Sequence, residues 1–255
     1  MPLEIVTVPC LSDNYAFLMR DGASGTAALV DAPEAAPIRA ALDARGWSLD
    51  LILITHHHGD HIEGVEELRA AHGAQVVGAK ADAHRLPPLD RAVSEGDEVA
   101  VGESRGRVLD VSGHTIGHIA YHFADDRAVF SADSLMALGC GRVFEGTHAM
   151  MWESLSKFRA MDPETLVCSG HEYTEANARF CLTIEPDNAD LQARAAAVKA
   201  ARARGEATVP SRLSEELATN SFLRACEPAL KAAIGMEGAD DAAVFAEVRR
   251  RKDRF

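Results

Sequence analysis

Short apolar runs separated by glycine- and proline-containing turns fill the first two-thirds of the chain. Short runs with this spacing predict β-strands. One of them, Leu49–Ile54, is almost continuously apolar, which indicates a strand buried on both faces. Two segments between the strands, Ala35–Ala44 and Ile62–Ala71, have helical composition. The predicted strands are Leu3–Val8, Tyr15–Met19, Ala27–Val30, Leu49–Ile54, Gln75–Val77, Glu98–Val101, Arg107–Val111, Ile119–Phe123, Ala128–Ser131 and Leu166–Ser169.

Beyond Tyr173 the strand pattern ends and alanine-rich segments with helical composition take over. Prolines at positions 186, 210 and 228 separate these segments, and proline interrupts helices. We therefore predict an α/β catalytic domain over residues 1–172 and a smaller all-helical domain over residues 173–255. The predicted helices of the second domain are Glu175–Leu182, Ala189–Ala203, Leu213–Leu217 and Asp241–Arg251.

Composition narrows the class of protein. Hydrophobic residues make up 47% of the chain and charged residues 25%, which is ordinary for a globular protein, and no apolar run approaches the length of a membrane span. The net charge of -13 disfavours nucleic acid as a partner. Five dispersed cysteines without a C-x-x-C pair, and a start that lacks a secretory pattern, predict a cytoplasmic protein. No obligatory protein partner is evident.

The end of the chain departs from this acidic trend. Residues Arg249–Phe255 contain five cations and one side-chain anion. This segment is either a solvated tail or a patch that binds an anion.

The strongest chemical signal is the run Thr55–His61, with the sequence T-H-H-H-G-D-H directly after the buried strand. His56 and His58 are two positions apart and so project to the same side of an extended segment, whereas His57 is out of phase. Asp60 and His61 follow where the chain turns into a helix. Four histidines and an aspartate within six positions have no plausible packing role, and they predict a metal site.

Three further candidates follow later predicted strands: His114, Asp133 and His171. The glycines Gly113 and Gly170 would let the backbone bend toward a metal. Together these candidate ligands are enough for two metal sites, with the Asp133 carboxylate bridging the two metals. The first site takes His56, His58 and His114, and the second takes Asp60, His61 and His171. Imidazole and carboxylate ligands without thiolate suit zinc, iron or manganese, and we favour two zinc ions. The remaining histidines (His72, His84, His118, His122 and His148) are assigned to the surface or to the support of the ligands.

With these residues in place, the chain resembles the metallo-β-lactamase superfamily, whose H-x-H-x-D-H motif stands here at His56–His61. The resemblance implies an αββα sandwich with the metals at one edge between two sheets. Within the superfamily the chain is similar to the glyoxalase II (hydroxyacylglutathione hydrolase) family over essentially its whole length. The segments that carry this similarity are 12–15 (S-D-N-Y), 112–115 (S-G-H-T), 140–147 (C-G-R-V-F-E-G-T), 170–174 (G-H-E-Y-T), 219–224 (T-N-S-F-L-R) and 250–253 (R-R-K-D).

The family resemblance implies hydrolysis of S-(2-hydroxyacyl)glutathione thioesters, with S-D-lactoylglutathione converted to D-lactate and glutathione in the second step of methylglyoxal detoxification. The two catalytic candidates are Asp60, which as a ligand of the second metal would orient the hydroxide, and Asp133, which would bridge the two metals. Both predicted domains would contribute to the glutathione site. The implied glutathione contacts are Arg142, Phe144 (where some members carry tyrosine), Tyr173, Arg249 and Lys252. Asp31 and the turn at residues 13–15 either support the ligands or are ordinary turn and cap residues.

Other functions remain open at this stage. A glutathione persulfide dioxygenase with a single iron, a lactonase and a β-lactamase share the scaffold. The net charge disfavours the nucleases of the superfamily, and the complete set of expected ligands disfavours a non-catalytic binding module.

Overall fold

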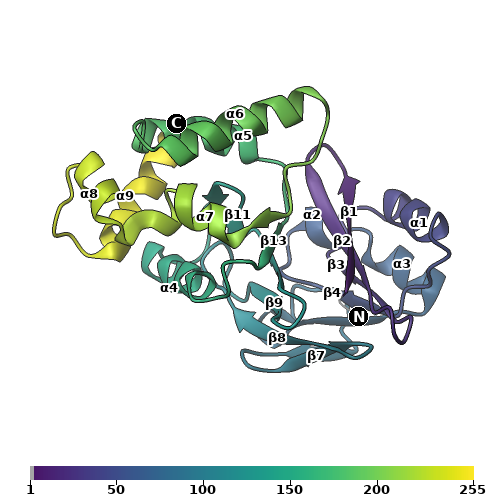
Figure 1. The fold of residues 1–255 in the computed structure, drawn as a ribbon. Coiled ribbons are helices and arrows are strands. Elements are labelled where there is room, and N and C mark those ends of the chain that lie inside the picture. Colours follow the sequence, from purple (N-terminus) through teal and green to yellow (C-terminus); the bar gives the residue numbers. More distant parts are fainter. Residues whose placement is uncertain (1–2) are drawn as a thin grey trace. The chain divides into compact units, whose positions relative to one another are not determined.

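The computed structural model describes residues 3–255 and divides the chain into two units. The first unit runs up to Asp110 and includes Ile116–Ala132, and the second consists of Val111–Thr115 and Asp133–Phe255. The first unit contains most of the strands, and the second is mainly helical (Figure 1).

A six-stranded sheet forms the frame of the first unit, and its strands follow one another in the order of the sequence. The first to third strands pair antiparallel. The third strand also begins a parallel series that continues to the sixth strand, and parallel neighbours require crossover connections. Helices α1 (Ala35–Asp43) and α3 (Val65–His72) lie within two of these connections. The strands are β1 (Glu4–Cys10), β2 (Asn14–Arg20), β3 (Ala27–Val30), β4 (Leu51–Leu53), β5 (Gln75–Ala79) and β6 (Arg91–Val93).

Four antiparallel strands form a second layer of the same unit: β7 (Glu98–Val101), β8 (Ser104–Asp110), β9 (Ile119–Phe123) and β10 (Ala128–Ala132). The rings of Phe17 on β2 and Phe130 on β10 lie 5.8 Å apart, and Phe130 also contacts Phe123 at 6.0 Å. These aromatic side chains fill the space between the two layers, where burial of apolar surface stabilises the fold.

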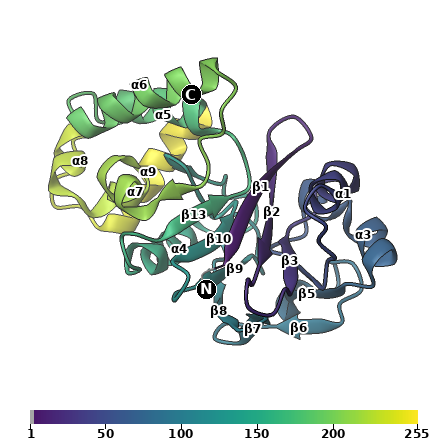
Figure 2. The same ribbon diagram turned by 45° about the vertical axis from the view of Figure 1, so that its right-hand side comes forward.

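The two helices cover the other face of the first sheet (Figure 2). Ile38 and Leu42 of α1 and Leu68 of α3 are completely buried, and they join one apolar cluster with Leu18 and Leu29 of the sheet. Because both faces of β4 are covered, Ile52 and Leu53 are buried and Leu51 is half-buried, in agreement with the buried strand that the pattern predicts. The loop that follows β4 therefore starts from a firmly packed strand end.

The second unit is mainly helical and also carries short strand pairs. Strands β11 (Leu135–Met136) and β12 (Gly139–Cys140) form a small hairpin, and β13 (Leu166–Ser169) pairs antiparallel with β14 (Ser211–Arg212). Its helices are α4 (His148–Arg159), α5 (Thr174–Ile184), α6 (Ala189–Ala203), α7 (Leu213–Thr219), α8 (Pro228–Ala233) and α9 (Asp241–Arg254).

Most predicted elements are confirmed, and the differences have local causes. The predicted helix at 62–71 is wrong at its start, because the structure has a short α2 (Gly59–Ile62) and then α3. Gly64 separates them: its amide donates to the carbonyl of Ala32, and a β-carbon on it would clash with backbone atoms of residues 32–35. Helices α4 and α8 and the short strands β6, β11, β12 and β14 carry too little periodicity to be predicted. Within residues 3–255, every helix is too short or too polar to span a bilayer.

Candidate metal centre

The run of histidines lies on the loop between β4 and α2, in the first unit. His56 and His61 are completely buried, whereas His58 and Asp60 are partly exposed. Nε2 of His56 lies 3.2 Å from Nδ1 of His58, and the ring centroids of His56 and His61 are 4.2 Å apart. Oδ2 of Asp60 lies 3.9 Å from Nε2 of His61. This crowding of buried ring nitrogens is typical of residues that share a metal.

Asp31 holds the histidine ligands in place, His61 directly and His56 through Thr55. Its side chain is buried, and its two oxygens accept hydrogen bonds from the amide and the hydroxyl of Thr55, both at 2.8 Å. Oδ2 of Asp31 also lies 2.8 Å from Nδ1 of His61. The Thr55 hydroxyl is in turn 3.0 Å from Nδ1 of His56. Because both rings direct Nδ1 to oxygen atoms, Nε2 is the nitrogen that each offers to a metal.

Asn14 supports Asp60 in the same way. Its side-chain amide donates to the Asp60 carboxylate and to the Asp60 carbonyl, each at 3.0 Å. Asn14 is buried and lies at the start of β2. The turn at residues 13–15 was expected either to support the ligands or to be an ordinary turn. The direct contact of Asn14 with the candidate ligand Asp60 favours support of the ligands.

His57 is turned to a different set of partners, in agreement with its position out of phase. Its Nδ1 lies 2.9 Å from Oδ2 of Asp82, a carboxylate that is completely buried. Arg85 forms an ion pair with the other Asp82 oxygen and donates to the carbonyl of Ile116 at 2.9 Å. Arg85 also lies 3.2 Å from Nε2 of His57. This ion pair ties the ligand loop to the segment that leads into His118.

Neither Asp82 nor Arg85 was identified from the sequence, because a lone Asp-x-x-Arg pair in a turn carries no chemical signal. His118 was assigned to the surface or to ligand support, and the structure places it in the second class. It is completely buried, and its ring stacks on that of His56 with centroids 4.5 Å apart and planes 11° apart.

The second unit holds the other three ligand candidates. Oδ2 of Asp133 lies 3.5 Å from Nε2 of His114 and 3.3 Å from Nε2 of His171, and all three side chains are buried. Nδ1 of His114 lies 2.7 Å from the carbonyl of Arg142, which again directs Nε2 to the candidate centre. A β-carbon on Gly141 would clash with the Asp133 carbonyl and the His114 ring. The tight backbone at Gly141 therefore keeps these ligands together.

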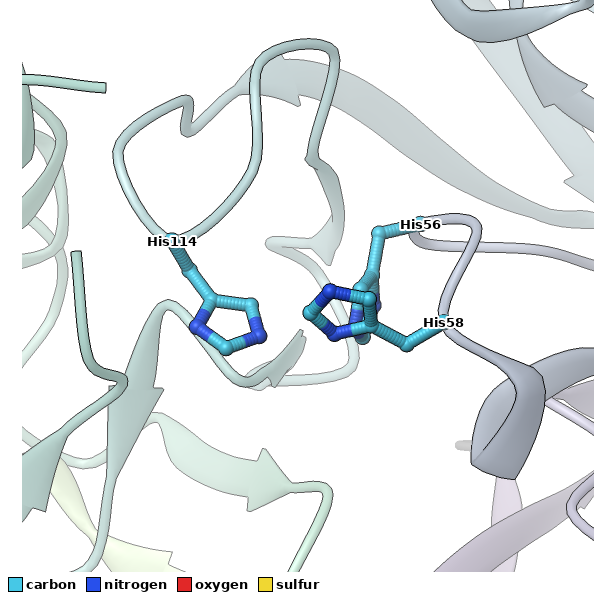
Figure 3. Close-up of side chains that lie close together, drawn as sticks. All are labelled: His56, His58 and His114. Atoms are coloured by element: carbon cyan, nitrogen blue, oxygen red, sulfur yellow. The ribbon is translucent and has the colours of Figure 1, made fainter. Parts of the chain in front are cut away.

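Three sets of side chains have ligand atoms that all lie within 4.8 Å of one another. Figure 3 shows the first of them, His56, His58 and His114. The second set is Asp60, His61 and His171, and the third is Asp31, His56 and His61. The donors are imidazole nitrogens and carboxylate oxygens, and this chemistry fits a divalent metal of the zinc, iron or manganese type.

The candidate substrate residues Arg142, Phe144 and Tyr173 are exposed beside the ligands of the second unit. The Phe144 ring lies 5.3 Å from that of His114, and the Tyr173 ring stacks on His171 at 4.6 Å. The Arg142 guanidinium lies 5.8 Å above Phe144, and its side chain is 59% exposed. These three exposed side chains are therefore accessible to a small molecule that binds next to the candidate ligands His114 and His171.

The two candidates on α9 differ from each other. Arg249 is buried, donates to the carbonyl of Cys140 at 3.0 Å and pairs with Asp253 at 2.9 Å, so its charge is not directed to solvent. Lys252 is partly exposed and donates to the carbonyl of Ala176 at 3.3 Å. Burial, followed by the charge of Arg249, lowers the pKa of Lys252 below its usual value.

Comparison with known families divides the chain in two. The model of the metallo-beta-lactamase superfamily matches residues 12–171, and the model of the hydroxyacylglutathione hydrolase C-terminus matches residues 172–255. Among curated proteins, hydroxyacylglutathione hydrolases from Cereibacter sphaeroides and Ruegeria pomeroyi are 64% and 63% identical, over 100% of this chain and 100% of their own length. One from Methylococcus capsulatus is 54% identical over 99% of each chain.

Solved structures agree on the architecture. ETHE1 from Myxococcus xanthus has a TM-score of 0.65 at 25% identity, over 98% of this chain and 90% of that one. The BLEG-1 B3 metallo-beta-lactamase has a TM-score of 0.61 at 21% identity, over 66% of this chain and 91% of that one, which concerns the fold alone. The predicted fold class, an αββα metallo-β-lactamase type with a helical C-terminal part, is confirmed.

Proposed function

Because the chain belongs to the hydroxyacylglutathione hydrolase family of the metallo-beta-lactamase superfamily, we propose that it hydrolyses S-(2-hydroxyacyl)glutathione thioesters. The leading substrate is S-D-lactoylglutathione, which yields D-lactate and glutathione, the second step of methylglyoxal detoxification. The observation that carries this proposal is the largely buried set of imidazoles and carboxylates within a chain that matches hydroxyacylglutathione hydrolases over its full length.

The proposed cofactor is a pair of divalent ions, zinc in the first place, with iron and manganese as alternatives. His56, His58 and His114 would hold one ion, Asp60, His61 and His171 the other, and Asp133 would contact both. When bound, such ions acidify water and polarise a carbonyl group. The geometry that supports this assignment is the orientation of His56, His61 and His114, whose Nδ1 atoms all face oxygen atoms of the chain itself.

The side chains of the protein supply orientation and charge. Asn14 fixes the Asp60 carboxylate, and the tight turn at Gly141 fixes Asp133, so neither carboxylate has to reorganise during the reaction. The leaving group is the glutathione thiolate. An ordinary cysteine thiol has a pKa of about 8.5, so the thiolate departs without a strong general acid.

Glutathione carries two carboxylates, and the protein has to bind them in spite of its net charge of -13. We propose that Arg142 and Lys252 attract the carboxylates, that Tyr173 offers a hydroxyl and that Phe144 packs against the tripeptide. Arg249 contributes to the site through its hydrogen bond to Cys140. The boundary near residue 172 and the role of the helical domain in binding belong to the same proposal, which is supported by the family matches that meet at residues 171 and 172. The cytoplasm remains the proposed location, supported by the absence of disulfides among residues 3–255.

To test this, the purified protein is incubated with S-D-lactoylglutathione, and hydrolysis is monitored through the release of the glutathione thiol. The metal content of the same sample is measured in parallel. We expect turnover of the thioester and about two divalent ions per chain. Oxygen consumption on glutathione persulfide and hydrolysis of a lactone and a β-lactam serve as comparisons. Turnover of one of these in place of the thioester would contradict the proposal. The names of the full-length relatives do not favour the dioxygenase or the lactonase.

A further inference from the structure

The β11–β12 hairpin lies between Asp133 and Arg142, and its main chain has an unusual set of partners. It is only six residues long, and Leu138 in its turn has a left-handed backbone, with φ at 55°. A hairpin this short pairs few of its own carbonyl groups. Its buried carbonyls therefore need donors from elsewhere in the unit.

Side chains of the second unit supply these donors for five consecutive carbonyls. Asn220, directly after α7, donates through its amide to the carbonyls of Met136 and Gly139, at 3.1 and 3.0 Å. Asn177 on α5 donates to Ala137 at 3.1 Å. The two remaining bonds run from Cys181 on α5 to Leu138 at 3.2 Å and from Arg249 on α9 to Cys140 at 3.0 Å.

Glu216 on α7 completes this arrangement from the acceptor side. It is completely buried and accepts from the amide of Leu138 at 2.8 Å. It also accepts from Ser211 at 2.6 Å and from Asn220 at 3.0 Å, and it pairs with Arg194. A buried carboxylate with this many donors is fully satisfied and has one position. We call Asn177, Cys181, Glu216, Asn220 and Arg249 the hairpin clamp.

The hairpin passes this constraint on to the candidate metal ligands. The amide of Gly141 donates to the carbonyl of Asp133 at 2.9 Å, so the two ends of the hairpin are tied together. The next carbonyl, that of Arg142, is the partner of Nδ1 of His114 at 2.7 Å. A shift of the hairpin would therefore move Asp133 and turn the His114 ring.

We propose that the hairpin clamp positions Asp133 and His114, with Asn220 as its central positioning residue. This inference rests on the proposed thioesterase function only for its effect on turnover. It assigns the helical part of the chain a second role beside substrate binding, and it gives the segment T-N-S-F-L-R a physical purpose. Cys181 fits this role because burial raises the pKa of its thiol to about 11, which keeps the thiol protonated as a donor.

The test compares Asn220→Ala with Asn188→Ala. Asn188 serves as the matched control because it is an asparagine of the same unit whose amide donates to a carbonyl, that of Ala218 at 3.1 Å. Its side chain also caps α6 by accepting from Leu191, so its partners are residues outside the hairpin. For both variants we would measure kcat and KM with S-D-lactoylglutathione, zinc affinity by titration, and hydrogen exchange of the peptide that covers residues 133–142.

In Asn220→Ala we expect kcat and zinc affinity each to fall about tenfold, with KM nearly unchanged. Asn220 acts on Asp133 and His114 through the hairpin, so we expect the lower end of the effect that loss of a direct partner of a metal ligand has. Exchange in residues 133–142 should become faster. Asn188→Ala should lower the thermal stability but leave kcat, zinc affinity and that exchange near the wild-type values. Equal effects of the two variants on all three would overturn the proposal and leave the clamp with a purely structural role.

Two features keep the test decisive. If wild-type protein does not hydrolyse the thioester, the proposed function fails, while zinc affinity and exchange still decide the positioning role. If Asn220→Ala does not fold, Cys181→Ala and Cys181→Ser replace it, because serine restores a donor toward Leu138 and alanine does not. Lower zinc affinity in Cys181→Ala with recovery in Cys181→Ser supports the clamp, and equal affinities would contradict it.

Discussion

Asp31 illustrates how single residues prepare this site. It takes a left-handed backbone conformation, with φ at 56°, directly after β3, a conformation that aspartate tolerates better than most residues. From there its two oxygens reach Thr55 and His61. A carboxylate on the outer nitrogen of an imidazole fixes the tautomer and raises the basicity of the nitrogen that faces the metal. From the sequence, Asp31 could either support the ligands or be an ordinary turn residue. Its contacts with Thr55 and His61 favour support of the ligands.

For Asp133, replacement by alanine should remove most of the thioesterase activity and lower the number of bound metal ions. The physical reason is that its buried carboxylate lies within 3.5 Å of the ring nitrogens of both His114 and His171. Metal analysis together with kcat would measure the effect, and the exposed Asp125→Ala is the control. Full turnover with normal metal content in Asp133→Ala would contradict the assignment.

Lys252 predicts a pH dependence of substrate binding. Its burial and the neighbouring charge of Arg249 lower its pKa below the usual 10.5, so the cation is present at low pH and is lost as pH rises through the lowered pKa. The affinity of the protein for S-methylglutathione, which carries two carboxylates, should therefore fall as pH rises. This fall should begin at a lower pH than it would if Lys252 had the pKa of an ordinary lysine. Calorimetric titration across pH would measure this.

The matched variant for that measurement is Lys252→Arg, because a guanidinium stays charged over the whole range. Its affinity should vary less with pH, while the titration of the ligand itself is common to both proteins. Identical pH profiles of wild type and variant would exclude Lys252 as a carboxylate partner.

Among the elements, α9 was predicted as a helix up to Arg251, but the role of its basic end was left open. The basic composition of its last residues left a solvated tail and an anion-binding patch open, but the residues are helical and Val244, Phe245 and Val248 anchor the helix in the core of the second unit. The helix periodicity then turns Arg249 inward and leaves Lys252 partly exposed. The two cations consequently differ in burial and in partners although they are three positions apart.

Deletion of residues 249–255 should for this reason change both kinetic constants. Loss of Lys252 should raise KM for the glutathione thioester, and loss of the bond from Arg249 to Cys140 should lower kcat. Lys252→Ala alone should raise KM by about tenfold with little effect on kcat, since a charge-assisted contact contributes about 1.4 kcal/mol or more. Steady-state kinetics of the two variants would show the contrast, and unchanged constants after the deletion would reduce the segment to solvated surface.

On the scale of the whole molecule, the candidate ligands concentrate several carboxylates and imidazoles within a few ångströms in a protein with a net charge of -13. Divalent ions would offset this charge, and a ligand that binds only the folded state raises its stability. Metal removal should therefore affect folding as well as activity.

Dialysis against a chelator should abolish thioester hydrolysis and lower Tm, and added zinc should restore both. Calorimetry and the thiol-release assay would follow the two effects, with a zinc-saturated chelator as the control for direct action on the protein. A chelated protein that keeps its Tm and its activity would contradict the metal assignment.

The sequence by itself determined the strand pattern, the helical second part and the chemical class of the centre, because hydrophobic periodicity and a dense run of metal-binding residue types are local properties. It also indicated His114, Asp133 and His171 as candidate ligands, since each follows a predicted strand. Only the tertiary structure decided how the ring nitrogens are oriented, why Arg249 is buried, and which side chains hold the β11–β12 hairpin. These features depend on contacts between residues far apart in the chain, such as the bond from Asn220 to Met136, and no local pattern records such contacts.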